Sequence, residues 1–131
     1  MVLVDTSVWI DFFNGTETAQ TRRFELLIQE SEDICISGTV LTEILQGIAS
    51  DKQFEKVRGI FSDLVYLETT KDTHLLSAQI FRRCRKKGIT IRKKIDCMIA
   101  ATCIQNSVYL LHGDRDFDHI ARVVPLRVVT T

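Results

Sequence analysis

Short apolar runs alternate with longer helical segments along the whole chain, and this alternation restricts the fold more than any other feature of the sequence. The expected strands are residues 2–4, 33–37, 65–67, 108–111 and 127–129. Strands that are short, apolar and separated by helices usually form parallel sheets with helices on both faces. The sequence therefore predicts an α/β fold, a three-layer α/β/α sandwich around a mainly parallel sheet of about five strands.

Helical segments lie between the strands and are marked by apolar residues at helical spacing or by capping residues. In one of them, Val40, Ile44 and Ile48 recur every four residues and would form one buried face. The expected helices are residues 7–13, 18–30, 39–49, 51–63, 70–87 and 94–106, with a helical turn at 117–121.

Size and composition are those of one globular domain covering residues 1–131. Hydrophobic residues make up 45% and charged residues 26% of the chain, and a chain of this length can bury a substantial core. No apolar run reaches the ~18 residues of a membrane span, and no basic segment precedes the first apolar run as in a signal peptide. The four cysteines lack metal-site spacing and are expected to be buried free thiols. The expected location is the cytoplasm, with no membrane contact.

Carboxylates follow two of the expected strands. Asp5 ends the first strand, and Asp114 and Asp116 follow the strand 108–111. In open parallel sheets, ligands bind beyond the carboxyl ends of the strands, so these positions suit a site. Capping of the next helix or loop is the alternative for each of them, and spacing does not choose between Asp114 and Asp116.

Two further carboxylates lie within helices. Asp96 falls on an apolar face of a helix that is apolar nearly all round, where a lone charge is costly. Favourable interaction with the helix dipole accounts for an acid in the first turn but not for that face. Glu43 lies beside the buried face of its own helix, and an ordinary solvated glutamate is the alternative there.

If these carboxylates converge, they repel one another, and a divalent cation is the usual way to offset that repulsion. Oxygen-only ligands suit Mg²⁺ or Mn²⁺ rather than zinc. A hard metal in a carboxylate pocket is typical of phosphodiester hydrolysis.

The formal net charge is zero, with 17 basic and 17 acidic side chains, which argues against a protein that coats nucleic acid by bulk charge. Eight of the cations nevertheless lie within thirteen residues that contain no acid. Such a patch beside an acidic pocket suits a polyanionic substrate, although cations at a helix end are also favoured by the dipole. The eight are Arg82, Arg83, Arg85, Lys86, Lys87, Arg92, Lys93 and Lys94.

Four segments resemble the motifs of the PIN-domain nucleases and, within them, the VapC toxins of prokaryotic toxin–antitoxin pairs. They are residues 4–11, 42–44, 94–101 and 111–117, in order and over essentially the whole chain. One departure is His112-Gly113, where the family often has a small hydroxyl residue.

The resemblance implies a Mg²⁺- or Mn²⁺-dependent endoribonuclease. It also implies a homodimer, an RNA substrate (tRNA, rRNA or mRNA) and a VapB-like antitoxin whose tail occupies the substrate groove. The implied site residues are the acidic set Asp5, Glu43, Asp96 and Asp114, with Asp116 as an outer or alternative ligand and Thr6 in support. From the charge pattern, the expected RNA-binding residues are Arg85, Lys86, Lys87, Arg92, Lys93 and Lys94.

Two PIN-domain alternatives stay open: a housekeeping RNA-processing nuclease without an antitoxin, and a domain that only binds RNA. Two other α/β classes fail on particular residues. A phosphoacceptor receiver domain needs a second acid after Asp5, where Thr6 stands, and a phosphatase of the Asp-x-Asp type needs an acid at Ser7.

Overall fold

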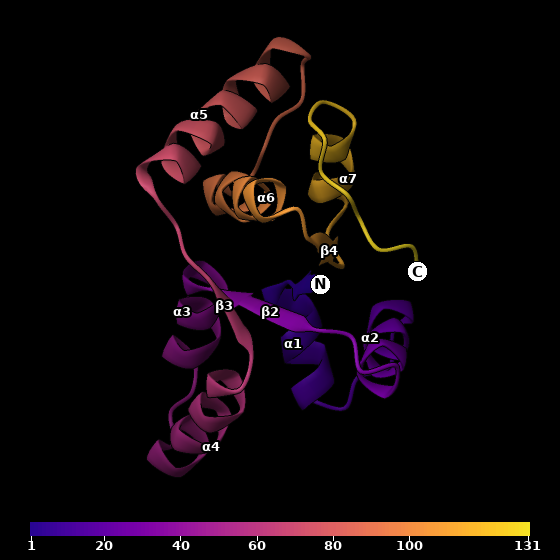
Figure 1. Ribbon diagram of the computed structural model, residues 1–131, viewed down its shortest axis with the longest axis vertical. Helices are drawn as coiled ribbons and strands as arrows, with labels where there is room; N and C mark the ends of the chain where they lie inside the picture. The colour runs from indigo at the N-terminus through magenta and orange to yellow at the C-terminus, as the bar shows by residue number, and fades with distance from the viewer.

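A parallel sheet with helices on both faces forms the core of the computed structural model, which describes all 131 residues (Figure 1). The strands are β1 (Val2–Val4), β2 (Ile34–Ser37), β3 (Val65–Leu67) and β4 (Tyr109–Leu111). Their order is β3-β2-β1-β4, and every neighbouring pair is parallel. The predicted three-layer α/β/α sandwich is confirmed.

Seven helices cover the sheet. In Figure 1, α5, α6 and α7 lie on one side of it, and α1 to α4 lie on the other. The end of α3 comes three residues before the predicted one because Gly47 caps the helix, and the predicted turn near residue 117 is a complete short helix. The helices are α1 (Thr6–Phe13), α2 (Ala19–Gln29), α3 (Gly38–Gln46), α4 (Asp51–Ser62), α5 (Lys71–Lys86), α6 (Lys94–Asn106) and α7 (Arg115–Ala121).

The fifth strand predicted at residues 127–129 is wrong. This segment forms only an isolated parallel bridge between Leu110 and Val128. Two backbone hydrogen bonds join it to β4, both at Leu110. Val128 and Val129 are only partly buried, so no strongly buried face holds the segment in register with β4 over a longer stretch.

An aromatic cluster holds α1 in place beneath the sheet. The Trp9 ring lies 4.8 Å from that of Phe24 in α2 and 5.1 Å from that of Phe61 in α4, both edge-on. Aromatic pairs in this geometry add to the energy of burial itself. Because α1 begins directly after β1, this packing also fixes Asp5 between the two elements.

The cysteines are buried and free, as predicted. Burial raises the pKa of the Cys97 thiol to about 11, and burial likewise raises the pKa values of the Cys35 and Cys84 thiols. A thiol that stays protonated is a poor nucleophile and a poor metal ligand. These side chains therefore serve as small apolar residues of the core.

The carboxyl ends of β1 and β4 meet at one edge of the sheet. Val4 is in register with Leu111, and the amide of Asp5 donates to the Leu111 carbonyl at 2.9 Å. The residues that follow each strand therefore emerge side by side, which brings Asp5 next to the segment that begins at His112. No helix of the protein is long and apolar enough to cross a membrane.

Candidate metal centre

Asp5 occupies the N-cap position of α1, yet its carboxylate does not cap the helix. The side chain accepts no hydrogen bond from the backbone of the first turn. Its Oδ2 instead accepts from the hydroxyl of Ser7 at 2.9 Å, and the residue is buried. The capping alternative therefore does not describe this side chain, whose carboxylate remains available at the sheet edge.

Thr6 connects α1 to α3. Its hydroxyl donates to Glu43 Oε1 at 3.1 Å, and Glu43 is half-buried. Glu43 is not among the residues whose oxygens lie together in the acidic cluster described below. Glu43 thus lies at the margin of the site, and its contact with the residues next to Asp5 is the hydrogen bond from Thr6.

Asp96 lies in the first turn of α6 and is only 2% exposed. Its Oδ2 has no hydrogen-bond partner. Burial raises the pKa of this carboxyl to about 7; nearby Lys93 lowers it, and the charges of Asp5, Asp114 and Asp116 raise it further. A buried carboxylate with an unpaired oxygen is costly unless it is protonated or coordinates a cation.

Asp114 and Asp116 come from the start of α7. Asp114 is the N-cap of that helix, and its Oδ1 accepts from the amide of Asp116 at 2.9 Å. Asp114 is half-buried and Asp116 is buried. The start of α7 brings both carboxylates close to Asp96. The structure therefore does not favour one of the two as a metal ligand over the other.

One oxygen atom from each of Asp96, Asp114 and Asp116 lies within 4.8 Å of the other two. The orphaned Oδ2 of Asp96 and an all-oxygen donor set fit a hard divalent cation. Asp5 lies close enough for its charge to raise the pKa of Asp96. The fold therefore gathers four of the five predicted acidic residues at one place, three of them within reach of a single ion.

Arg92 contacts this acidic cluster directly. Its Nε donates to Asp116 Oδ2 and its Nη2 to Asp114 Oδ1, both at 3.0 Å, and Lys93 Nζ lies 3.9 Å from Asp114 Oδ2. These two acids raise the pKa of the Arg92 guanidinium. Two of the predicted RNA-binding cations are thus engaged with acids of the site, a pairing that spacing along the chain did not indicate.

The other cations of the patch are exposed and form no ion pair. Most of them lie in the last turns of α5, and the segment after α5 descends toward the start of α6 beside α7 (Figure 1). The unpaired cations are Arg82, Arg83, Arg85, Lys86, Lys87 and Lys94.

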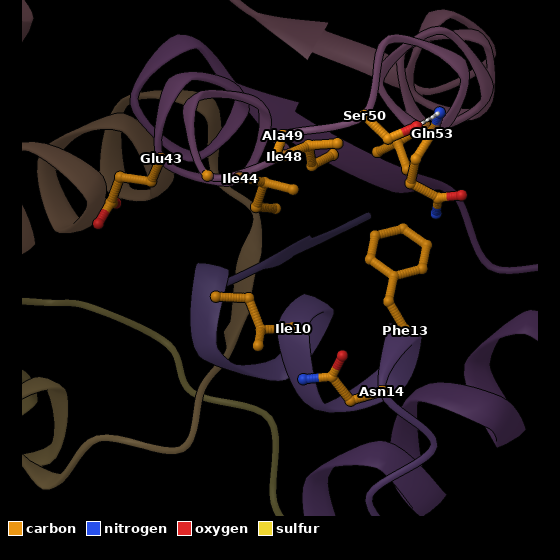
Figure 2. A pocket seen from close by; sticks show the side chains of 11 residues that line it. Ile10, Phe13, Asn14, Glu43, Ile44, Ile48, Ala49, Ser50 and Gln53 are labelled. Carbon is orange, nitrogen blue, oxygen red and sulfur yellow. Dashed lines mark hydrogen bonds between the residues drawn. The ribbon is translucent and has the colours of Figure 1, made fainter.

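A groove of about 460 Å³ runs beside Glu43 between α1, α3 and α4 (Figure 2). Six of its eleven lining residues are hydrophobic, among them Ile10, Phe13 and Ile48. Ile10 is 44% exposed. Figure 2 shows the Glu43 carboxylate at one end of the groove, pointing away from the apolar side chains.

Comparison with known proteins identifies the family to which this protein belongs. The family model described as PIN domain matches residues 2–123, and the chain therefore belongs to the PIN-domain family.

Relatives similar to this chain in sequence include VapC ribonucleases. Ribonuclease VapC11 of Mycobacterium tuberculosis is 32% identical over 134 residues, covering 99% of this chain and 98% of the relative. Ribonuclease VapC1 of Methanocaldococcus jannaschii is 36% identical over 106 residues, covering 79% and 68%. The crystal structure of VapBC2 from Rickettsia felis, bound to promoter DNA, matches with a TM-score of 0.76 at 21% identity and covers 98% of each chain.

Two supporting residues were not among the predicted site residues. Ser7 binds the Asp5 carboxylate, and the signal for it was a hydroxyl close after that aspartate, which suits either orientation of the carboxylate or capping of the helix. His112 contacts the loop that carries Asp114, and only the departure from the family pattern at that position marked it.

Proposed function

We propose that this protein is a divalent-metal-dependent endoribonuclease and the toxin of a toxin–antitoxin pair. The observation that carries the proposal is the buried Asp96 carboxylate at the carboxyl edge of the sheet: its Oδ2 has no hydrogen-bond partner, and one of its oxygens lies within 4.8 Å of oxygens of Asp114 and Asp116. A structural ion pair would leave no such oxygen without a partner. We assign the metal to Asp5, Asp96, Asp114 and Asp116.

The chain's own residues build the site around that ion. Ser7 holds the carboxylate of Asp5 and Thr6 holds that of Glu43, so neither needs to reorganise when RNA arrives. A bound Mg²⁺ or Mn²⁺ would supply charge stabilisation for the phosphoryl group under attack and lower the pKa of a water. Packing around Asp96 excludes bulk water, which strengthens every electrostatic contact inside the site.

The unpaired cations at the end of α5 suit the flanking phosphates of an RNA strand. Lys and Arg contacts to phosphate position a nucleic acid without reading its sequence. Because Arg92 and Lys93 already contact Asp114 and Asp116, we assign the first phosphate contacts to Arg85, Lys86 and Lys87, with Arg92, Lys93 and Lys94 nearer the scissile bond.

Charge reversal of three cations at the C-terminal end of α5, Arg85→Glu, Lys86→Glu and Lys87→Glu, is expected to weaken RNA binding at least about tenfold at low salt. The slope of log K against log salt should fall by about 0.7 for each lost phosphate contact to single-stranded RNA. Binding is measured by fluorescence anisotropy over a salt series, with Ca²⁺ in place of the catalytic ion.

The matched control carries Arg22→Glu, Lys56→Glu and Lys71→Glu. These three exposed cations lie on α2, α4 and the far end of α5, and their reversal gives the same change in net charge. Equal weakening by the two triple variants would assign the effect to bulk charge and remove the α5 patch from the site.

One of the similar solved structures is a toxin–antitoxin complex from Klebsiella pneumoniae and others are VapBC structures, and we propose a VapB-like antitoxin for this chain. The groove in Figure 2 suits an apolar segment of such a partner, because Ile10 and Phe13 lie along it and Glu43 at its end can pair with a basic side chain. We further propose a homodimer and a cytoplasmic location, where RNA and antitoxin are both present.

The two PIN-domain alternatives differ from this proposal in testable ways. A domain that only binds RNA has no need for a buried carboxylate with an unpaired oxygen, so the state of Asp96 favours catalysis. A housekeeping nuclease would cleave RNA but would lack a neutralising neighbour encoded beside it.

Cleavage of a total RNA pool tests the nuclease. The wild-type protein with Mg²⁺ or Mn²⁺ is expected to yield discrete fragments. EDTA should slow their appearance by at least about 100-fold, since bound metal supplies several kcal/mol of transition-state stabilisation, and Asp5→Asn should act in the same direction. Fragments that persist in EDTA and in the variant would contradict the proposal.

Growth tests the toxin role. Expression of the chain alone should arrest growth, and co-expression of its neighbouring short open reading frame should relieve the arrest. Cleavage without arrest would favour the housekeeping alternative.

A further inference from the structure

His112 is a buried side chain whose two ring nitrogens contact two residues of the α7 region, the N-cap residue Asp114 and Asp118 within the helix. The residue is 7% exposed and directly follows β4. Its Nδ1 lies 3.1 Å from the amide nitrogen of Asp114, which donates to it. Its Nε2 lies 3.1 Å from Oδ1 of Asp118. The ring also packs 5.1 Å from that of Phe117, centroid to centroid, which restricts its rotation.

These two contacts assign the ring one tautomer. Nδ1 must carry a lone pair because it accepts from a backbone amide, so the proton of a neutral ring is on Nε2. The Nε2–H group then donates to the Asp118 carboxylate. Asp118 lies in α7 and its side chain is 54% exposed, so this second contact is on the solvent-facing side of the ring.

The inner contact begins a chain of hydrogen bonds that ends at the acidic cluster. His112 accepts from the amide of Asp114, and Oδ1 of Asp114 in turn accepts from the amide of Asp116 at 2.9 Å. The hydrogen bond from the Asp116 amide fixes the Asp114 carboxylate relative to the main chain of Asp116. Arg92 contacts the same two acids from the outside, through a side chain that is 64% exposed.

We propose that His112 is a positioning residue of the metal centre: its Nδ1 holds the main chain at Asp114 and thereby sets the Asp114 and Asp116 carboxylates opposite Asp96. The inference rests on the proposed metal centre. Groups that orient metal ligands commonly change metal affinity by about 10–100-fold when they are removed. His112 has no need to touch the ion or the RNA.

Two amide substitutions separate the two ring nitrogens. In His112→Asn, the side-chain oxygen can accept from the amide two residues ahead, which is the ordinary geometry of an Asx turn. In His112→Gln, the longer side chain reaches the Nε2 position instead and leaves the Asp114 amide without its acceptor. Both variants replace a buried ring by a smaller amide, so loss of packing is similar in the two.

Mn²⁺ binding, measured by calorimetry and by electron paramagnetic resonance, is the first readout. His112→Gln is expected to weaken Mn²⁺ affinity about tenfold. His112→Asn is expected to stay within about threefold of the wild type, and a threefold change in affinity corresponds to about 0.7 kcal/mol. Equal weakening in both variants, or no weakening in either, would overturn the proposal. Asp118→Ala, which keeps the Nδ1 contact, is expected to match the wild type within about threefold.

Two measurements without metal keep the inference separate from the proposed function. In the wild type, ¹⁵N correlation spectra of the imidazole should show Nδ1 unprotonated, and an Nδ1–H tautomer would overturn the assignment. Exchange of the Asp114 amide hydrogen should be about fivefold faster in His112→Gln, since a lost hydrogen bond is worth about 1 kcal/mol, and near wild type in His112→Asn. Failure of the wild type to bind Mn²⁺ would overturn the metal centre, while amide exchange would still decide the role of His112 in the loop.

Discussion

Replacing Asp96 with asparagine is expected to slow RNA cleavage by more than about 100-fold, because removal of a metal ligand should cost more than removal of a group that merely orients one. The substitution keeps the size of the side chain and removes its charge. Because the Asp96 carboxylate is 2% exposed and faces three other acids, the same change should make the metal-free protein more stable at pH 8. Opposite effects on activity and stability are the signature of a functional charge held in an unfavourable place.

Asp72→Asn provides the matched control. Asp72 lies in the first turn of α5, as Asp96 does in α6, but it is exposed. Its replacement should cost only the favourable dipole interaction, about 0.3–1 kcal/mol, and leave cleavage unchanged. Cleavage is measured with a labelled RNA and stability by urea unfolding in EDTA. An Asp96→Asn protein that cleaves like the wild type, or that is less stable without metal, would contradict the assignment of Asp96.

The free energy of unfolding of the metal-free protein is expected to fall as the pH rises from about 4 to about 7. The pKa of Asp96 is raised in the folded state from 3.8 to about 7, first by burial. Below the lower pKa, both states hold the proton; between the two values, only the folded state does; above the upper value, neither does. The contribution of this carboxyl to stability is therefore complete at low pH and is lost by pH 8. At about 1.4 kcal/mol per pKa unit, the loss is on the order of 4 kcal/mol.

Subtracting the pH dependence of the unfolding free energy of Asp96→Asn from that of the wild type leaves the contribution of the Asp96 carboxyl, because all other titrating groups are common to both proteins. Urea unfolding in EDTA at pH 4.5, 6 and 8 gives the two curves. Mn²⁺ should restore stability at pH 8, by about 2.7 kcal/mol at 100 times the dissociation constant, and should do less at pH 5.5, where it must displace a proton. A wild-type curve parallel to that of Asp96→Asn would show that the carboxyl is already ionised without strain.

Most of the fold was predictable because its signals are local. Alternation of apolar runs with capped helices depends on residues a few positions apart, so four strands and the helices between them were found with small errors at their ends. Residues 127–129 have the composition of a strand, but pairing depends on what lies opposite, and there the segment meets β4 at one residue only. A local sequence pattern carries no information about how many residues of a segment will pair with a neighbouring strand.

The acidic residues were predictable for a different reason. Asp96 stands on an apolar helix face and Asp5 at the end of a strand, and both places are costly or unusual for a charge. Glu43 has no such mark, and the structure joins it to the site only through Thr6. The chemical contrast between a residue and its surroundings was thus the useful signal.

By itself, the sequence determined the layer architecture, the family and the kinds of residue that gather at the sheet edge, because periodicity and motif order are properties of the chain. The tertiary structure decided which groups meet. It placed both Asp114 and Asp116 within reach of Asp96, paired Arg92 with them, and brought His112 Nδ1 to the Asp114 amide. These contacts depend on distances of about 3 Å between atoms, set by the β1–β4 register and the turn into α7, and residue spacing cannot specify distances on that scale.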